Sequence, residues 1–478
     1  MTQTVKHWKN YIAGTWCDAT ESLPVHNPAT AEVAATVACA SIEDVDRAMQ
    51  AARACVQSRC LVRERPAQRA ALMQRIAREI HALVDEAAEV LVMENGKTLE
   101  DARAEFLESA RYFEYYGGMA DKIEGKSIPL GDDYIDYTVY EPVGVSVQII
   151  PWNFPPSIAA RSLAPALAAG NAVVIKSPEV SPLAITYLAI ACERAGLASG
   201  ALSILCGVGN VVGDALVRHP ETNQIVFTGS VVTGQHILRA AAERATPCVM
   251  ELGGKSAAVV FPDADLDQLM DSVKWGIFFN AGQVCSAMSR MLVHEDIYPE
   301  LVDRVATFAQ SLTLGDGIDN ADITPLVSQI QQEAVLNMCQ AASHEGARLV
   351  TGGIKPERHG YFIEPTVFAD VTPEMSLFGT EVFGPVLAMT PFSTEQEAWD
   401  LANATDYGLV AGVFTQDLQR SLRATQQLRA GQIFVNEWYA GGIETPFGGI
   451  GLSGFGREKG QEAIYSYVQT KNVAIRLS

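Results

Sequence analysis

The amino-acid sequence predicts an α/β protein with two doubly wound α/β domains, and three observations support this fold class. Between residues 145 and 252, short apolar runs alternate with helical segments, a pattern typical of a parallel sheet covered by helices on both faces. A second alternating region covers about residues 256–435. The chain has 478 residues, which is more than a single hydrophobic core usually organises.

Five apolar runs, each four to six residues long and bounded by polar or glycine-containing segments, are expected to form the first sheet. These are Val145–Ile150, Ala172–Ile175, Leu202–Leu205, Gln224–Phe227 and Cys248–Leu252. Helices are expected after Pro155 and from Pro182 to Ala195.

The segment before the first sheet is expected to be helical. Ser41 is a candidate N-cap, with Asp44 three residues later and apolar residues following at helical spacing. A long amphipathic run from Pro66 stops at Gly96, a C-cap candidate, and the next run ends at the glycine pair 117–118.

Two further segments have a strand pattern of a different kind. Residues 119–143, which include Tyr134–Tyr140, suggest a protruding hairpin, and Tyr465–Leu477 is a strand pattern near the C-terminus. Exposed strand edges favour pairing with another chain, although an ordinary surface hairpin would have the same pattern.

Composition excludes several classes of partner. Hydrophobic residues make up 48% of the chain and charged residues 19%, values typical of a globular protein. The formal net charge of −21 argues against nucleic acid or an anionic membrane as partner. The longest apolar stretch, Ile158–Ile175, is interrupted by Arg161, Pro165 and two further breaks, so it is too short to span a bilayer.

Cysteine usage and the N-terminus predict a cytoplasmic protein. The nine cysteines contain no C-x-x-C pair, and the closest two are Cys55 and Cys60. Neither a disulfide framework nor a metal site is therefore expected, and a reducing compartment is favoured. The N-terminal segment has no apolar core that would mark a secretory signal.

Three short runs carry the chemistry. Cys285 ends the run Phe278–Cys285, where Asn280, Gly282 and Gln283 are unusual for core filling. Glu251 follows a predicted strand and precedes two glycines, and Asn153 lies between a predicted strand and a predicted helix. A thiol, a carboxylate and an amide donor indicate covalent catalysis through a thioester, with a base and an oxyanion site.

With these three runs, the chain resembles the aldehyde dehydrogenase superfamily from about residue 11 to its C-terminus. The resemblance implies an aldehyde dehydrogenase-like fold, with two doubly wound α/β domains and a small β oligomerisation arm. It implies a dinucleotide-binding domain in 1–120 and 144–250 (with 436–462 returning to it), a catalytic domain in 251–435, and an arm in 121–143 and 463–478.

The resemblance also implies roles for the three residues. Cys285 is the expected nucleophile, Asn153 with the Cys285 N–H the oxyanion site, and Glu251 the general base that activates water. The expected reaction is NAD(P)-dependent oxidation of an aldehyde to a carboxylic acid. Members that transfer the acyl group to coenzyme A characteristically lack this glutamate, so Glu251 favours a free acid as product.

The cofactor signals differ in strength. The spacing of Gly207–Gly213 is a weak dinucleotide signal, whereas Ser230 follows a predicted strand and opens a predicted helix, where free N–H groups can meet a pyrophosphate. A carboxylate at Glu179 can accept ribose hydroxyls and would repel a 2′-phosphate, which favours NAD, with NADP as an alternative. The expected cofactor residues are Ile149, Pro151, Trp152, Lys176, Ser177, Glu179, Gly209, Phe227, Gly229, Ser230, Leu252, Glu381 and Phe383.

Phe154, Ile158 and Arg161 are spaced i, i+4 and i+7, which places them on one face of the helix after Asn153. The resemblance implies that this face lines the substrate tunnel. Trp438 and Phe447 complete the expected tunnel. Arg161 has two interpretations: it binds a distal carboxylate of the substrate, or it is structural and bonds a loop carbonyl or Glu444.

The proton relay is expected to depart from the family pattern, since many members have a lysine at the position of Ser162. The relay would then use water, Ser162 or Glu458.

The substrate is either an aromatic or aliphatic aldehyde or a semialdehyde that carries a carboxylate. The protein is expected to be a homo-oligomer, either a dimer or a tetramer. A coenzyme A-acylating enzyme of the same fold, a cysteine hydrolase without redox chemistry and a non-catalytic protein are the alternatives.

Overall fold

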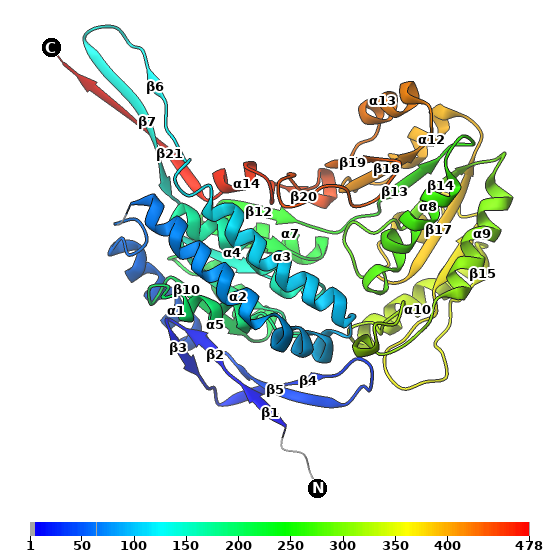
Figure 1. The fold of residues 1–478 in the computed structure, drawn as a ribbon, viewed down its shortest axis with the longest axis horizontal. Coiled ribbons are helices and arrows are strands. Elements are labelled where there is room, and N and C mark those ends of the chain that lie inside the picture. Colours follow the sequence, from blue (N-terminus) through cyan, green and yellow to red (C-terminus); the bar gives the residue numbers. More distant parts are fainter. Residues whose placement is uncertain (1–4, 64, 478) are drawn as a thin grey trace.

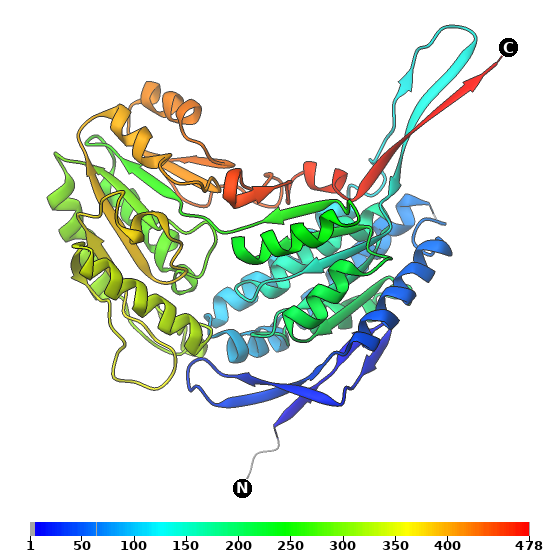
Figure 2. The same cartoon turned by 180° about the vertical axis from the view of Figure 1, so that it is seen from behind.

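Two α/β lobes and a projecting arm make up the protein in the computed structural model, which describes residues 5–63 and 65–477. One lobe contains most of the first half of the chain, and the other contains the strands between residues 257 and 435 (Figures 1 and 2). Residues 1–4, part of the segment in which no secretory signal is expected, lie outside the described residues. The predicted α/β class is confirmed.

The first sheet has eight strands in the order β20-β12-β11-β8-β9-β10-β2-β3. Its five central strands are parallel and confirm all five predicted runs to within two residues at their ends. They are β8 (Val145–Ile149), β9 (Ala172–Ser177), β10 (Leu202–Cys206), β11 (Gln224–Thr228) and β12 (Cys248–Glu251).

The edges of this sheet and a separate small sheet come from strands that the sequence pattern did not reveal. The antiparallel edges are β2 (Asn10–Ile12), β3 (Thr15–Cys17) and β20 (Gly454–Phe455). A three-stranded sheet contains β1 (Lys6–Trp8), β4 (Glu21–His26) and β5 (Val33–Cys39). Strands of two or three residues are too short for a periodicity of two to be recognised.

The predicted helix signals are confirmed at both ends. The Ser41 side chain accepts the Asp44 N–H, and the Asp44 carboxylate accepts the Ser41 N–H, which is a complete capping box. Gly96 ends its helix in the left-handed region at φ 91°, a conformation that favours glycine. These helices are α1 (Ile42–Gln57), α2 (Pro66–Asn95) and α3 (Leu99–Gly117).

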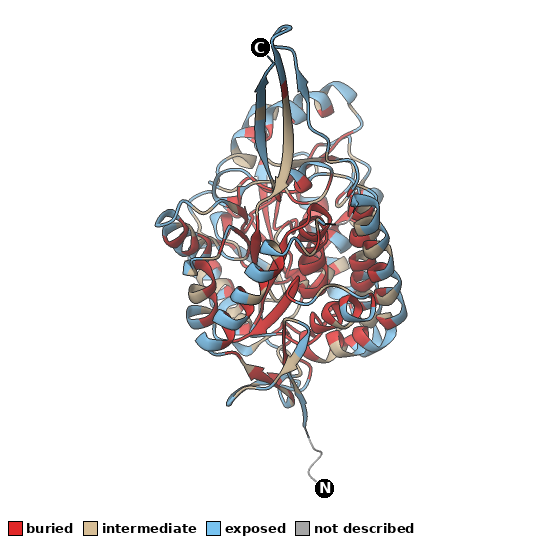
Figure 3. Ribbon diagram, turned by 90° about the vertical axis from the view of Figure 1, so that its left-hand side faces the viewer, coloured by how far each residue is buried: buried red, intermediate tan, exposed pale blue. Residues whose placement is uncertain are grey.

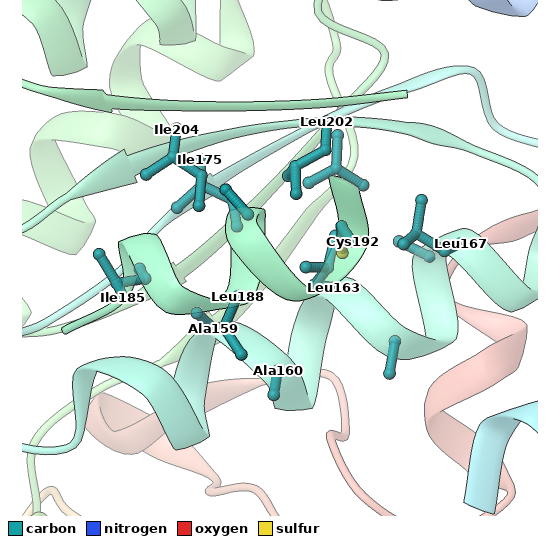
Figure 4. Packing of buried hydrophobic residues seen from close by; sticks show 14 of the residues in the cluster. Ala159, Ala160, Leu163, Leu167, Ile175, Ile185, Leu188, Cys192, Leu202 and Ile204 are labelled. Carbon is teal, nitrogen blue, oxygen red and sulfur yellow. The ribbon is translucent and has the colours of Figure 1, made fainter. Parts of the chain in front are cut away.

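Helices α4 and α5 pack together beside strands β9 and β10 to form the core of the first lobe. Their apolar side chains interdigitate in Figure 4, where Leu163, Leu188 and Cys192 lie between the two helices and the sheet. The buried Glu94 carboxylate accepts the N–H groups of Leu183 and Ala184, and regular helix begins only at Thr186. The helices of this region are α4 (Pro155–Ala169), α5 (Thr186–Arg194), α6 (Asp214–Arg218) and α7 (Val231–Ala242), with the π-helical turn η1 (Gly209–Gly213).

The second sheet has the order β15-β16-β17-β14-β13-β18-β19 and is parallel except at β15. Its strands are β13 (Ala257–Val260), β14 (Arg290–His294), β15 (Arg348–Thr351), β16 (Thr366–Ala369), β17 (Val386–Phe392), β18 (Val410–Phe414) and β19 (Gln432–Val435). The helices and helical turns that follow in the chain are α8 (Leu266–Val273), η2 (Lys274–Phe278), η3 (Phe279–Gly282), α9 (Tyr298–Ser311), η4 (Gly317–Asp319), α10 (Gln329–His344), α11 (Ser376–Gly379), α12 (Glu395–Ala402), α13 (Leu418–Gln427), η5 (Gly451–Ser453) and α14 (Glu462–Tyr465). The domain boundaries themselves remain predictions.

The arm is a three-stranded sheet in the order β21-β7-β6 that projects from the first lobe (Figure 1). Its strands are β6 (Ser127–Ile128), β7 (Tyr134–Pro142) and β21 (Val468–Arg476). Most of its residues are exposed or half-buried (Figure 3). No helix in the described parts of the chain is long and apolar enough to cross a membrane.

The expectation of no disulfide is wrong for one pair of cysteines. The structure joins Cys55, in the last turn of α1, to Cys60 just beyond its end. The chain turns back here, because the Cys60 N–H donates to the Cys55 carbonyl at 3.1 Å, and the two Cα atoms lie 5.3 Å apart, within the usual span of a disulfide. The other seven cysteines are free.

Candidate active site

A cavity of about 240 Å³ brings together residues from both lobes. Its wall contains the three predicted catalytic residues Cys285, Glu251 and Asn153. Seven of the predicted cofactor residues line it too, namely Pro151, Trp152, Gly229, Ser230, Leu252, Glu381 and Phe383. The same cavity is lined by Thr228, Gly253 and Gln331, which sequence analysis did not select.

Cys285 is presented by a tight turn. Asn280 and Ala281 adopt left-handed conformations at φ 49° and 51°, and a side chain at Gly282, at φ 72°, would clash with the carbonyl of Gly384. Only glycine therefore fits this close approach. Burial raises the pKa of the Cys285 thiol to about 11, and the positive charge of Arg161 opposes that rise.

Asn153 lies against the same turn. Its Nδ2 donates to the Gln283 carbonyl at 3.0 Å, which is two residues before Cys285. Because an amide nitrogen has two hydrogens, a second donor is left for an oxygen that develops negative charge beside the thiol. The Asn153 carbonyl accepts from Lys97 Nζ at 2.9 Å and from Asn280 Nδ2 at 3.3 Å.

Lys97 is a structural residue that sequence analysis missed. It is 1% exposed and forms a buried ion pair with Glu105, which is 4% exposed. Glu105 also accepts the N–H of Ser157 at 3.2 Å in the first turn of α4. The pair thus joins α3 to the Asn153 segment, and the one sequence signal for it is a lysine directly after the C-cap Gly96.

Glu251 ends β12 and is 2% exposed. Neither of its carboxylate oxygens has a hydrogen-bonding partner among the described residues. Its pKa is raised well above the usual value, first by burial and second by the nearby Glu458 carboxylate, with Arg161 and Arg457 opposing. A carboxyl group in such surroundings is suited to accept a proton near neutral pH.

The segment from Phe227 to Gly234 has the features of an anion-binding turn. Ser230 caps α7 by accepting the Thr233 N–H at 3.3 Å. A side chain at Gly229 would lie 2.5 Å from the Phe227 ring, and one at Gly234 would lie 2.6 Å from Leu252. Only glycine therefore fits these two close approaches, and the N–H groups at the N-terminus of α7 favour phosphate oxygens.

A second group of predicted cofactor residues lies together but outside this cavity. Lys176 Nζ lies 3.7 Å from Glu179 and donates to the Ser177 carbonyl at 3.0 Å, and the Glu179 carboxylate accepts the Gly209 N–H. Burial lowers the pKa of Lys176, and Glu179 opposes this shift. Ile149 is half-buried at the end of β8, whose register partner in β9 is Lys176.

Glu381 and Phe383 form part of the wall of the cavity that contains Cys285. Glu381 accepts the Gly254 N–H at 3.0 Å, and burial raises the pKa of this carboxyl to about 7. Phe383, at φ 55°, packs edge-on against Trp152 with ring centroids 5.3 Å apart. Gln331 holds this strained residue by donating to its carbonyl at 2.8 Å.

Comparisons with known proteins agree with this geometry. The family model described as "Aldehyde dehydrogenase family" matches residues 16–473. This chain belongs to the aldehyde dehydrogenase family. It is 40% identical to aminoaldehyde dehydrogenase 1 of Pisum sativum over 99% of this chain and 96% of that protein. It is 42% identical to betaine aldehyde dehydrogenase of Cereibacter sphaeroides over 95% and 93%.

Solved structures of the family show the same fold. The NAD⁺ complex of an aldehyde dehydrogenase from Bacillus cereus superposes with a TM-score of 0.97 at 38% identity, covering 99% of this chain and 97% of that chain. The predicted resemblance to the aldehyde dehydrogenase superfamily and its fold are confirmed.

Three of the predicted tunnel residues, Phe154, Trp438 and Phe447, belong to the same hydrophobic cluster as Cys285. Phe154 stacks on Phe279 with centroids 5.8 Å apart, and Ile158 is buried one turn later. The Trp438 indole donates to the Ser286 carbonyl at 3.1 Å. Phe447 lies under the Arg161 guanidinium at 5.4 Å.

Arg161 is paired within the protein. Its Nη2 forms an ion pair with Glu458 and donates to Thr228 Oγ1 at 3.3 Å. Glu444, which sequence analysis named as a structural partner, is paired with Arg111 instead. That choice of partner is wrong, because Glu444 is an exposed loop residue whereas Arg161 is only 6% exposed.

The two predicted relay residues, Ser162 and Glu458, have different bonding partners. The Ser162 hydroxyl is fully buried and donates to the Ile158 carbonyl at 3.1 Å within α4. Glu458 is 1% exposed and paired with Arg161. Ser162 therefore has its hydrogen-bonding capacity satisfied by its own helix, whereas Glu458 lies in the charged group beside Glu251.

The raised pKa of Cys285 predicts a slow thiol at neutral pH in the free enzyme. Its rate of carbamidomethylation by iodoacetamide should rise about tenfold for each pH unit between about pH 7 and pH 10, because only the thiolate reacts. Site-resolved mass spectrometry measures this rate, with the buried Cys192 as an unreactive internal control. A rate that is already constant above pH 8 would contradict the environment described for Cys285.

Proposed function

We propose that this protein oxidises an aldehyde to a carboxylic acid, with NAD as hydride acceptor, through a thioester on Cys285. Membership of the aldehyde dehydrogenase family makes it an oxidoreductase that acts on the aldehyde group. The observation that carries the finer proposal is that Cys285, Glu251 and Asn153 line one cavity together with Trp152 and Phe383.

The residues present fit a nicotinamide dinucleotide. The open turn at Gly229 and Ser230 suits the pyrophosphate, and the Glu179 carboxylate suits the hydroxyls of a ribose. Glu381 offers a carboxylate for the second ribose, and the Trp152–Phe383 pair offers an apolar wall for the nicotinamide ring. When bound, the nicotinamide supplies the hydride acceptor. Glu179 supports a preference for NAD, with NADP as a weaker alternative.

The first half of the reaction belongs to Cys285 and Asn153. The Cys285 sulfur, as thiolate, bonds to the aldehyde carbon, and the oxygen that gains negative charge accepts from Asn153 Nδ2 and the Cys285 N–H. Loss of a hydride from that carbon to a bound nicotinamide would leave the thioester. Preorganised donors of this kind lower the barrier because they need no rearrangement during the reaction. Lys97 and Gln283, which hold Asn153, keep its amide at the required position.

The second half belongs to Glu251. Its carboxylate takes a proton from water while the water oxygen bonds to the thioester carbon, and the carbon–sulfur bond then breaks to release the acid and the Cys285 thiolate. Retention of Glu251 supports hydrolysis over transfer to coenzyme A. A cysteine hydrolase without redox chemistry would have no need of the Trp152–Phe383 wall, which is proposed to hold the nicotinamide ring.

The substrate that the tunnel supports best is an uncharged aromatic or aliphatic aldehyde. Phe154, Phe279 and Trp438 offer an apolar wall, and the charge of Arg161 is already matched by Glu458. A semialdehyde that carries a carboxylate would need a free cation in the tunnel or would have to break this ion pair.

We further propose a homo-oligomer, a dimer or a tetramer, assembled through the arm of β6, β7 and β21. The support is the free edge of β21, since unpaired strand edges favour pairing with another chain, and the exposed apolar side chains Ile135, Ile475 and Leu477. A cytoplasmic location stays a prediction, because the related pea enzyme is named as peroxisomal.

Replacement of Glu251 by glutamine should separate the two halves of the reaction. One equivalent of NADH per active site should still form in a rapid burst, whereas steady-state turnover should fall about 10²–10⁴-fold, the usual contribution of a general base. Stopped-flow absorbance measures both phases. Glu437→Gln, at an exposed site two residues after the end of β19, is the matched control and should behave as wild type. Loss of the burst itself in Glu251→Gln would refute the assigned role.

The pairing of Arg161 predicts a preference between two test aldehydes. The kcat/KM for benzaldehyde should exceed that for succinic semialdehyde about tenfold or more, because an unpaired carboxylate is costly to bury. NADH formation with each aldehyde at equal concentration measures the ratio. A higher kcat/KM for the semialdehyde would mean that Arg161 leaves Glu458 to bind substrate.

Removal of β21 should abolish assembly. A chain that stops after Tyr467 should have the mass of a monomer, whereas the full-length protein should have the mass of a dimer or tetramer, both measured by light scattering after size-exclusion chromatography. Ile330→Ser, at a site that is 80% exposed on α10, is the surface control. An unchanged mass after truncation would place the interface elsewhere.

A further inference from the structure

Three charged side chains form a buried group near the thiol, and only one of them, Glu251, has a role in the reaction proposed above. Arg161, Glu251 and Glu458 are each 6% exposed or less. A guanidinium has donors enough for either carboxylate or for both. Among the described residues Arg161 forms an ion pair with Glu458 alone of the two.

Arg161 contacts Glu458 and the strand beside the one that carries Glu251. Thr228, which accepts from the guanidinium at 3.3 Å, is the register partner of Glu251 in the neighbouring strand. Arg161 Nε is buried and has no hydrogen-bonding partner among the described residues. The guanidinium thus lies between its paired carboxylate and the strand end that carries the unpaired one.

Glu458 is tied to the same place through the backbone. Phe447 and Glu458 exchange two N–H to carbonyl bonds of 2.6 and 2.8 Å. A side chain at Gly448, the next residue, would lie 2.8 Å from Glu251 Oε1. The bridge therefore carries Glu458 and places the backbone at Gly448 against Glu251, and the Glu458 charge acts on Glu251.

We propose that Arg161 and Glu458 are a positioning pair for Glu251: the guanidinium keeps Glu458 ionised and offsets its charge, so that Glu251 is the carboxylate that gains and loses the proton. This inference rests on the proposed hydrolysis of a Cys285 thioester. In that step Glu251 takes the proton from the attacking water, and Glu458 stays an anion bound to Arg161. In α4 the positive charge near the two carboxylates is therefore that of Arg161. The neighbouring Ser162 hydroxyl is bonded within its own helix.

Other titratable groups also face the two carboxylates. Arg457 and Cys285 act on Glu251, and Lys459, Tyr112, Tyr116 and Tyr467 lie around Glu458. All of them stay unchanged in the variants below, so a difference between variants reports the charges at positions 161 and 458 alone.

The test measures hydrolysis of the acyl-enzyme directly. Cys285 is acetylated with p-nitrophenyl acetate in the absence of NAD, excess ester is removed, and the loss of the acetyl group is followed by intact-protein mass spectrometry across a pH series. The midpoint of the pH profile reports the pKa of the general base. This readout separates the base from substrate binding and from hydride transfer.

Variants at the two positions should move that midpoint in opposite directions. Arg161→Gln removes a positive neighbour of Glu251 and should shift the midpoint to higher pH, by about one to three pH units. Glu458→Gln removes a negative neighbour and should shift it to lower pH by a similar amount. Arg161→Lys should stay close to wild type, and so should Ser162→Ala, the matched control one residue along α4.

A purely structural role predicts slower hydrolysis with the midpoint unchanged, and that result in both single variants overturns the proposal. Shifts of the same sign in both variants overturn it too. Thermal melting checks that each variant folds, and either single variant decides the sign by itself if the other does not fold. Failure of wild-type Cys285 to become acetylated would instead overturn the proposed thioester chemistry and this inference with it.

Discussion

The crossing between the two lobes is the constraint on which the site depends. β12 ends the parallel part of the first sheet at Glu251, and β13 begins in the second sheet at Ala257, so the chain passes between the sheets in five residues. A side chain at Gly253 would clash with Glu381, and one at Gly254 would lie 2.5 Å from the Cys285 carbonyl. The two glycines therefore let the base, the thiol loop and the Glu381 carboxylate approach one another.

The close approach has an electrostatic consequence, since it buries charged groups that water would otherwise solvate. Removing a charge from water costs several kcal/mol unless a partner compensates. Lys97 with Glu105 and Arg161 with Glu458 are compensated pairs, whereas Glu251 is left without a partner among the described residues. The site thus stabilises its supporting residues by pairing and keeps the reacting carboxylate unmatched, which is how burial raises the pKa of a catalytic acid or base.

The sequence was sufficient for the parts of the fold that local rules control. The capping box at Ser41, the left-handed Gly96 and the five central strands follow from hydrogen bonding and periodicity within short windows. The strands of residues 6–39 and the Cys55–Cys60 disulfide escaped these rules. β1, β2 and β3 have three residues each, and the pairing of β4 with β5 shifts register between Val25 and His26. A turn that closes a disulfide depends on the path of the chain after α1, which periodicity does not describe.

The partner of Arg161 shows why a site is harder to predict than the elements that carry it. Helical spacing grouped Ile158 and Arg161 in α4 with Phe154, its N-cap residue, and their place along a substrate tunnel stays a prediction. Which carboxylate that guanidinium meets depends on residues almost three hundred positions later, where the chain returns beside β12. The Phe447–Glu458 bridge positions a carboxylate there, and this carboxylate already pairs with Arg161. A cation predicted for substrate binding is therefore used within the protein, and the tunnel it borders is left to apolar contact.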